Sequence, residues 1–381
     1  MPYFDHNATT PLASTAREVW LRTNEEHWQN PSSLYRDAAK ARLRLDHARA
    51  RMAEYLGAAE KEIVFTSGAT ESVHAALAHL AAQAGPAAEI AVNRTEHSAV
   101  LSAARRWFGS RIRWLNTDRR GVIQWNELEQ KAPGAAAVVV MAANNETGTI
   151  QPWEKITELC QRERVPYVCD AAQWLGKLPA GGLGDADWTF GSGHKFGAPK
   201  GTGFLKIPAS ARNFSAQPGG AQENGHRGGT EDLASILAMV EMLAEAEHRK
   251  VLLESERLTW RTQFEQTVGS AVSGVEVIGA EVDRLWNTVS LLMPHGASQR
   301  WIAKLDKMGF AISNGSACAT RKEESSHVLA AMGYSAEQAR RVLRISSGWE
   351  TRLDDWLGLA GAFAKAAPEL AATENSDVIK V

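Results

Sequence analysis

The chain has few cysteines, no long apolar run and almost no net charge, and each shortage excludes a class of protein. Its 381 residues contain three cysteines, Cys160, Cys169 and Cys318, whose spacing forms neither a disulfide framework nor a metal-binding motif. No segment approaches the roughly 20 apolar residues of a membrane-spanning helix, and residues 1–12 lack the features of a signal or transit peptide. The net charge of −2 leaves no basic surface for nucleic acid or an anionic membrane. We therefore expect a cytoplasmic protein with no metal site and no nucleic-acid or membrane partner.

What the chain does have is an alternation of short apolar runs and longer helical patterns from about residue 36 to residue 250. Hydrophobic residues make up 44% of the chain, which is enough for a sizeable core. The alternation predicts an α/β layer with a mostly parallel sheet, in which ligands bind beyond the carboxyl ends of the strands. We expect the strands at residues 62–67, 89–94, 111–116, 135–143, 165–170, 186–192 and 201–207, and helices at 72–82, 99–108 and 153–164.

A second, smaller α+β domain is expected after a long helix over about residues 231–266. Short strand patterns then follow at 275–280, 287–293, 310–315 and 341–348, with helices at 298–308 and 335–341. We place the boundary near residue 250, inside the long helix. The expected division is a large domain from 15 to 250, a small domain from 1–14 and 251–370, and a flexible tail at 371–381.

Lys195 and Asp170 are the sharpest chemical signal in the sequence. Asp170 ends one expected strand, and Lys195 follows the next one in the run SGHKFGAPKG. The two side chains can therefore face each other across one pocket at the edge of the sheet. Pyridoxal 5′-phosphate (PLP) needs this pair: a lysine that forms a Schiff base with its aldehyde, and an acid that keeps its pyridine nitrogen protonated. A lone lysine among glycines would be an ordinary solvated charge, and the carboxylate partner argues against that interpretation.

Other residues near this expected edge have both functional and ordinary interpretations. In FTSGATES, Ala69 and Thr70 open a helix after a strand, which suits a phosphate group or a plain helix N-terminus. His97 could stack on the cofactor ring and move protons, or be a buried structural histidine. Asn145 and Gln173 could donate to a ring hydroxyl, or simply form turns.

Cys318 and Arg344 are candidates for the substrate side of the reaction. Cys318 lies in NGSACAT, among small residues and before a charged run, so nothing in its surroundings is suited to burying a thiol. Cys160 and Cys169 lie in patterns that bury a small apolar side chain. Arg344 lies within an apolar strand pattern, where it needs either a substrate carboxylate or an internal acidic partner.

Taken together, these motifs resemble those of the cysteine desulfurases. These are PLP enzymes of the class V aminotransferase type, which serve nitrogen fixation and iron–sulfur cluster assembly. The resemblance spans about residues 3 to 350 and rests on segments that occur in the same order, namely FDHNATTP, NPSSLY, FTSGATES, TEHSAV, NNETG, DAAQ, SGHKFGAPKG, GGAQENGHRGGTED and NGSACAT.

The resemblance implies a fold, a reaction and a set of roles. The fold would be that of the aspartate-aminotransferase-like PLP enzymes (fold type I), and the reaction would convert L-cysteine to L-alanine, leaving a persulfide on Cys318. Lys195 would carry the cofactor, and Arg344 with Asn145 would bind the substrate. The implied cofactor-binding residues are Lys195, Asp170, Gln173, His97, Asn145, Ala69, Thr70, Ser192, His194 and Thr230. Thr230 would reach the phosphate of the neighbouring subunit, which implies a homodimer, and a sulfur-acceptor protein such as an iron–sulfur scaffold would be a further partner.

Five positions depart from the family pattern, and alternatives remain open. The departures are Val73, His74, Tyr35, Ala221 and Ser325. None of them removes an implied cofactor contact. They bear instead on which substrate is bound and on which protein accepts the sulfur. A related PLP lyase acting on selenocysteine, cysteine sulfinate or another cysteine derivative would need the same cofactor residues but less of Cys318. A non-catalytic PLP-binding scaffold would have no use for Lys195, Asp170 and Cys318 together.

Overall fold

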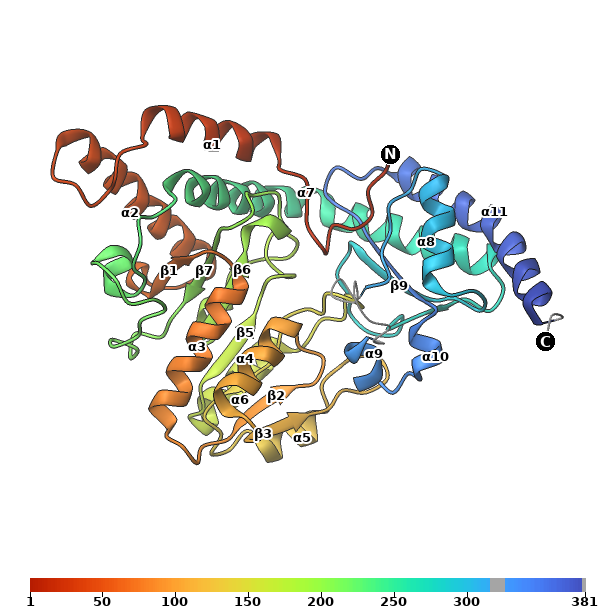
Figure 1. Ribbon diagram of the computed structural model, residues 1–381, viewed down its shortest axis with the longest axis horizontal. Coiled ribbons are helices and arrows are strands. Elements are labelled where there is room, and N and C mark those ends of the chain that lie inside the picture. The colour runs from red at the N-terminus through yellow and green to blue at the C-terminus, as the bar shows by residue number, and fades with distance from the viewer. Residues whose placement is uncertain (316–325, 379–381) are drawn as a thin grey trace.

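A computed structural model describes residues 1–315 and 326–378 of the chain, with the backbone alone at 250–253 and 373–378. Within this part, seven strands form one sheet in the order β1-β7-β6-β5-β4-β2-β3 (Figure 1). Only β7 runs antiparallel to its neighbours, so the sheet is mixed but mostly parallel, as expected. The strands are β1 Ile63–Thr66, β2 Ile90–Asn93, β3 Ile112–Leu115, β4 Val138–Val139, β5 Tyr167–Asp170, β6 Trp188–Ser192 and β7 Gly203–Lys206.

Helices cover both faces of this sheet, because successive strand side chains point to opposite faces. In β1, Ile63 and Phe65 pack in one core with helices α2 and α6, whereas Val64 packs in the other with α3 and α4. The helices of this part of the chain are α1 Ser14–Glu26, α2 Arg36–Leu56, α3 Ala69–Ala84, α4 Ser98–Phe108, α5 Trp125–Lys131 and α6 Trp153–Glu163.

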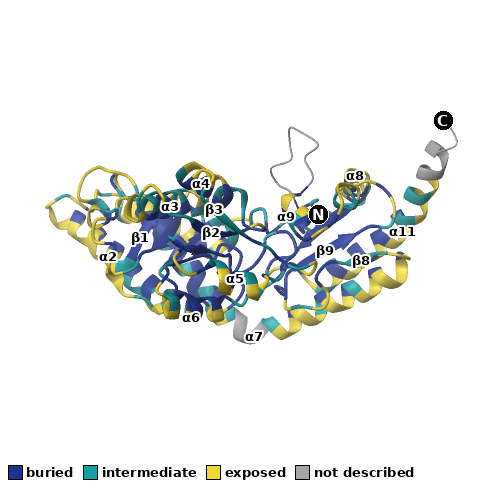
Figure 2. Cartoon of the chain, turned by 90° about the horizontal axis from the view of Figure 1, so that it is seen from below, coloured by how far each residue is buried: buried dark blue, intermediate teal, exposed yellow. Residues whose placement is uncertain are grey.

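A three-stranded antiparallel sheet lies at the other end of the molecule, in the order β10-β9-β8. Its core includes Phe264, Trp301 and Trp356, and it is separate from the two cores of the large sheet (Figure 2). Phe4 joins this core, because the N-terminal residues pair with the small sheet through the bridge between Asp5 and Ser346. The elements here are β8 Glu276–Val277, β9 Thr288–Leu292, β10 Val342–Ser346, α8 Ser298–Lys307, α9 His327–Ala331, α10 Ala336–Ala339 and α11 Leu353–Val378.

Helix α7, Leu233–Ala271, runs along both parts. Its first half packs against α1 and α2, and its later half contacts α11 and β9 (Figure 1). Asp232 caps its N-terminus by accepting a hydrogen bond from the Ser235 amide. The helix passes through residue 250, and the division into two domains there stays a prediction.

Two sequence expectations are corrected by the structure. The apolar run 135–143 contains a strand of only two residues, β4, although its backbone continues to bond to β5 through the Val140 and Ala142 amides. Residues 310–315 form isolated bridges and no strand, because Ala311 pairs with Tyr3 while Ser313 pairs with Arg344. Helix α11 extends to Val378, and the flexible tail expected at 371–381 stays a prediction. Among the described helices, none is long and apolar enough to cross a membrane.

Candidate active site

A pocket of about 560 Å³ opens beyond the carboxyl ends of β1, β5 and β6. Parallel strands bring their carboxyl ends to one edge, so residues distant in sequence meet there. The residues that line it include Ala69, Thr70, His97, Asn145, Asp170, Gln173, Ser192, His194 and Lys195. All nine were predicted as cofactor contacts from the sequence, and the fold brings them together around one cavity.

Lys195 reaches the pocket from a single turn of 3-10 helix, Gly193–Lys195, directly after β6. Its Nζ donates to the carbonyl oxygens of Asn7 at 2.7 Å and Ala8 at 2.9 Å. Burial and, to a lesser extent, the positive charge of Arg344 lower the pKa of Lys195 to about 8, against the opposing effect of the Asp170 carboxylate. A fraction of Lys195 is therefore unprotonated near neutral pH, and this is the state that a nucleophilic or basic amine requires.

Asp170 ends β5 with its carboxyl group buried. Its Oδ1 accepts a hydrogen bond from the Ala172 amide at 2.9 Å. Burial raises the pKa of Asp170 to about 6, against the opposing effects of the Ala172 amide and Lys195. A buried carboxylate of this kind needs a cationic partner, and the pocket it lines has room for one.

We expect Asp170→Asn to stabilise the cofactor-free protein in a pH-dependent way. A carboxyl pKa raised from 3.8 to about 6 makes folding less favourable as pH rises through that window, because the charged form is disfavoured in the folded state. Removing the charge should therefore increase the free energy of unfolding by roughly 3 kcal/mol at pH 8, and by little at pH 4.

Urea denaturation of the cofactor-free protein at both pH values measures this difference. Asp306→Asn, at an exposed position on α8, is the matched control and should show no comparable dependence on pH. An Asp170→Asn protein with the same gain at pH 4 and pH 8 would contradict the assignment of a burial penalty to this carboxylate.

His97 lies directly before α4 and caps it. Its Nδ1 accepts the Ala99 amide at 3.2 Å, so the neutral ring carries its proton on Nε2. Burial, together with the smaller effects of Lys195 and His327, lowers the pKa of His97 to about 4. The ring is thus a neutral imidazole at the pocket wall, with an Nε2–H group to donate.

The opposite end of the pocket has free donors at the start of α3. Gly68 precedes this helix with a φ of 149° and provides no side-chain cap, so the first amides of the helix have no intrahelical acceptor. A Cβ at Gly68 would lie 3.0 Å from the Ser192 Oγ, so the residue allows the turn to approach β6 closely. His194 Nδ1 lies 3.1 Å from Thr9 Oγ1, which orients the ring at this end.

This arrangement fits PLP on the structure's own features. Uncapped helix amides with Ser192 and Thr70 suit a phosphate, and the buried Asp170 carboxyl suits a protonated ring nitrogen. The buried Asn145 Oδ1 has no hydrogen-bond partner among the described residues, so the pocket leaves a polar atom to be satisfied. Lys195 would carry the cofactor between these two ends.

Arg344 has an acidic partner within the protein. Its guanidinium forms an ion pair with Asp5 at 2.6 Å and donates to the carbonyl oxygens of Asn145 and Gly315. Of the two interpretations of this buried arginine, the internal pair is therefore present. A role of Arg344 toward substrate stays a proposal, supported by its place beside Asn145.

Among the predicted site residues that the structure describes, Thr230 and Arg344 do not line this pocket. Thr230 is exposed and lies in a neighbouring hollow that shares Ser67 and Gly201 with the pocket. Cys318 lies outside the described residues.

Sequence reasoning missed the part that the N-terminal segment plays. Besides accepting from Lys195 through Asn7 and Ala8, this segment holds the lysine turn through Thr10, whose Oγ1 donates to the His194 carbonyl and accepts the Gly197 amide. The signal was present in FDHNATTP, but no local pattern shows that Asn7 and Ala8 reach a lysine 188 and 187 positions later.

Comparisons with known proteins point to one family. A model of the class-V aminotransferases matches residues 2–355. The chain is 33% identical to a protein named cysteine desulfurase IscS from Dictyoglomus turgidum, over 93% of this chain and 91% of the relative. It is 34% identical to a cysteine desulfurase from Cereibacter sphaeroides, over 92% and 91% of the two chains.

Solved structures agree with these matches. A structure described as a NifS-like protein superposes with a TM-score of 0.88 at 28% identity, covering 97% of this chain and all of that one. A structure described as SspA in complex with cysteine superposes with a TM-score of 0.80 at 29% identity, covering 91% of this chain and 99% of that one.

Proposed function

The chain belongs to the class-V aminotransferase family, and we infer that it is a PLP-dependent cysteine desulfurase that passes sulfur from L-cysteine to Cys318. The observation that carries this proposal is the convergence of Lys195, Asp170 and His97 on one pocket. A buried acid, a partly unprotonated lysine and a neutral histidine are the groups that PLP chemistry on an amino acid requires. A non-catalytic scaffold would need none of these tuned side chains.

Lys195 is the group that moves the proton at the α-carbon of the substrate. PLP, when bound, supplies an electron sink for the α-carbon, and Asp170 holds the ring nitrogen in the protonated form that makes the sink effective. The lowered pKa of Lys195 leaves an amine that can accept the α-proton near neutral pH and return it later. Asn7 and Ala8 direct Nζ through their carbonyl oxygens.

His97 is placed to act at the sulfur side. Because Ala99 occupies Nδ1, the proton that the ring can give lies on Nε2. We assign this Nε2–H to the control of protonation around the substrate thiol. Arg344 and Asn145 are proposed to bind the substrate carboxylate, which holds the thiol in one orientation.

Sulfur transfer is proposed to occur at Cys318. Its thiolate attacks the substrate sulfur, a new S–S bond forms as the bond between the substrate β-carbon and sulfur breaks, and the β-carbon receives a proton. The products are L-alanine and a persulfide on Cys318, so no external oxidant or reductant is consumed in this step. An acceptor thiol, on a sulfur-acceptor protein such as an iron–sulfur scaffold, then takes the outer sulfur.

We propose that the enzyme works as a homodimer in which Thr230 contacts the cofactor phosphate of the partner subunit. Thr230 is exposed, and it lies outside the cofactor pocket of its own chain. Thr230→Ala should weaken PLP binding by roughly tenfold or more, because one hydrogen bond to a charged group is lost.

Titration of the cofactor-free protein with PLP, followed by absorbance, measures this change, and sedimentation measures the oligomeric state. Thr262→Ala, at an exposed position on α7 whose hydroxyl donates to the Leu258 carbonyl of the same helix, serves as the control. A Thr230→Ala protein with unchanged PLP affinity, or a wild-type monomer that retains PLP, would contradict the contact between subunits.

The experiment that tests the proposed function follows both products. The PLP-loaded protein is incubated with L-cysteine and a thiol reductant, and alanine and sulfide are measured together. A desulfurase gives alanine and sulfide in equal amounts. A lyase that eliminates the sulfur group directly gives pyruvate and ammonia in place of alanine, and that result would overturn the proposal.

A further inference from the structure

Lys177 is a buried lysine that the reaction described above does not use. It lies in the turns that follow β5, four residues after Gln173, and its side chain is 5% exposed. Burying an ammonium group is unfavourable, so a lysine at such a position needs strong partners or a function. Burial, together with the smaller effects of the Lys195 and Arg344 charges, lowers the pKa of Lys177 to about 7.

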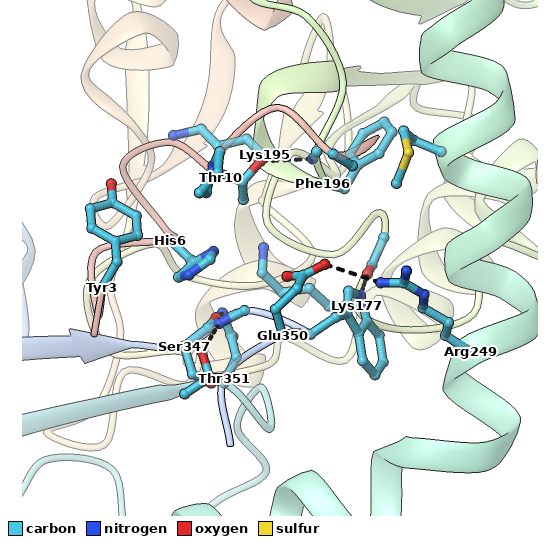
Figure 3. Close-up of a pocket in the computed structure, with 18 of the residues that line it drawn as sticks. Tyr3, His6, Thr10, Lys177, Lys195, Phe196, Arg249, Ser347, Glu350 and Thr351 are labelled. Carbon is cyan, nitrogen blue, oxygen red and sulfur yellow. Dashed lines mark hydrogen bonds and ion pairs between the residues drawn. The ribbon is translucent and has the colours of Figure 1, made fainter. Parts of the chain in front are cut away.

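Lys177 separates the cofactor pocket from a second cavity. This cavity has a volume of about 370 Å³ and lies between the N-terminal segment, α7 and residues 347–351. Figure 3 shows Lys177 on its wall, with His6 and Glu350 beside it and Lys195 on the far side. Lys195 lines both cavities, whereas Gln173 lines only the cofactor pocket among the cavities described here. Lys177 therefore does not line the cofactor pocket itself, but it contacts Gln173, which does.

The hydrogen bonds of Gln173 fix which end of its amide faces the pocket. Lys177 Nζ donates to Gln173 Oε1 at 3.0 Å, and also to the Gln173 carbonyl oxygen at 3.1 Å. On the other side, Gln173 Nε2 donates to the Asn7 carbonyl oxygen at 2.9 Å. The Asn7 carbonyl oxygen can only accept, so it fixes Nε2 on its side of the amide, and the hydrogen bond from Lys177 Nζ holds Oε1 on the other side; together these partners exclude the flipped amide. The second N–H of Nε2 is left for the cofactor pocket.

We propose that Lys177 is a positioning residue, which orients the Gln173 amide so that an N–H group faces the ring oxygen of the cofactor. An N–H donor favours the deprotonated form of that oxygen, whereas a flipped amide would present a carbonyl oxygen and oppose it. The inference rests on the proposed contact between Gln173 and the cofactor, and it adds a second group, besides the Asn7 carbonyl, that holds the amide in this direction.

The same contacts connect Lys177 to the reacting lysine. The Asn7 carbonyl oxygen accepts both Gln173 Nε2 and Lys195 Nζ, at 2.9 and 2.7 Å. Freeing the Gln173 amide would therefore change one of the two acceptors that direct Lys195. Lys177 thus acts on the ring oxygen through Gln173 and on the lysine amine through Asn7.

Lys177→Met tests the proposal through the visible spectrum of the bound cofactor. Loss of the donor to Oε1 should shift the absorbance band and its titration with pH, and should weaken PLP binding by about threefold to tenfold. Lys206→Met is the matched control, because Lys206 is equally buried and donates to the Ala186 carbonyl at 2.9 Å, outside the cofactor pocket. That variant should change thermal stability and leave the spectrum unchanged. Lys177→Arg keeps the donors and has the cavity to extend into, so it should restore the spectrum.

Variants of Gln173 separate this inference from the assignments on which it rests. Gln173→Leu should shift the spectrum, and adding Lys177→Met to it should then shift it no further. If Gln173→Leu alone has no effect, the contact of Gln173 with the cofactor is wrong. If Lys177→Met shifts the spectrum equally with and without Gln173, or leaves it unchanged in the wild-type background, the positioning role of Lys177 is wrong. If Lys177→Met does not fold, Lys177→Leu, which also removes the donor to Oε1, provides this comparison.

Discussion

Replacing Lys195 with alanine is expected to lower the rate of alanine formation from L-cysteine by about 10⁴-fold, the upper end of what one acid–base group contributes. The variant loses both the covalent attachment of PLP and the amine that moves the α-proton. The pocket should still form, because its other residues are held by β1, β5 and β6 and by backbone contacts of the N-terminal segment. Rates with and without added PLP measure the loss.

Borohydride reduction followed by peptide mapping checks the attachment itself. The wild-type protein should gain the mass of the reduced cofactor on Lys195. Lys206→Met is again a suitable control, because it removes a buried lysine of β7 without touching the pocket, and it should label on Lys195 as the wild type does. A reduced cofactor found on Lys200, which also lines the pocket, would show that the wrong lysine had been assigned.

The sequence predicted the parts of the site that depend on strand ends. Asp170 and Lys195 could be placed together because each follows a short apolar run, and parallel strands end at one edge. His97 and Ala69 follow from the same rule. These positions depend on local pattern and sheet geometry alone, so they can be predicted from a single sequence.

The contacts that support the pocket from outside it could not be predicted in this way. Asn7 and Ala8 direct Lys195 through backbone carbonyl groups, which have no sequence signature. Asp5 pairs with Arg344 across 339 positions of the chain, and only the pairing of the N-terminal segment with the small sheet brings them together. In the sequence, nothing distinguishes Lys177 from an ordinary exposed lysine, and only the structure shows that it is buried.

The short strand β4 shows a limit of hydrophobic pattern itself. The run 135–143 is apolar throughout, so the pattern alone gave no point at which the strand should end. In the fold the run passes from β4 to the pocket wall at Met141 and Ala143, and to Asn144, whose side chain bonds to the Thr95 carbonyl. The apolar character of these residues reflects burial in two settings, a sheet and a ligand pocket.

The second large effect is expected from Cys318→Ala, which should reduce sulfur release from L-cysteine to the background without enzyme. Lys195, Asp170 and His97 remain, so the spectrum of the bound cofactor and its response to cysteine should be retained. Only the thiol that receives the sulfur is removed. Measuring the spectral response and sulfide release on one preparation separates substrate binding from sulfur transfer.

Cys160 and Cys169 serve as controls for the Cys318 substitution, because both are fully buried. Burial raises the pKa of Cys160 to about 12 and raises that of Cys169 as well, so neither is present as the reactive thiolate near neutral pH. Cys160→Ala and Cys169→Ala should keep the wild-type rate and lower the free energy of unfolding by about 1 kcal/mol each. Alkylation of the native protein should label Cys318 first. If Cys318→Ala releases sulfur at the wild-type rate, the acceptor thiol is not on this chain, and a lyase that eliminates the sulfur group directly would account for the pocket equally well.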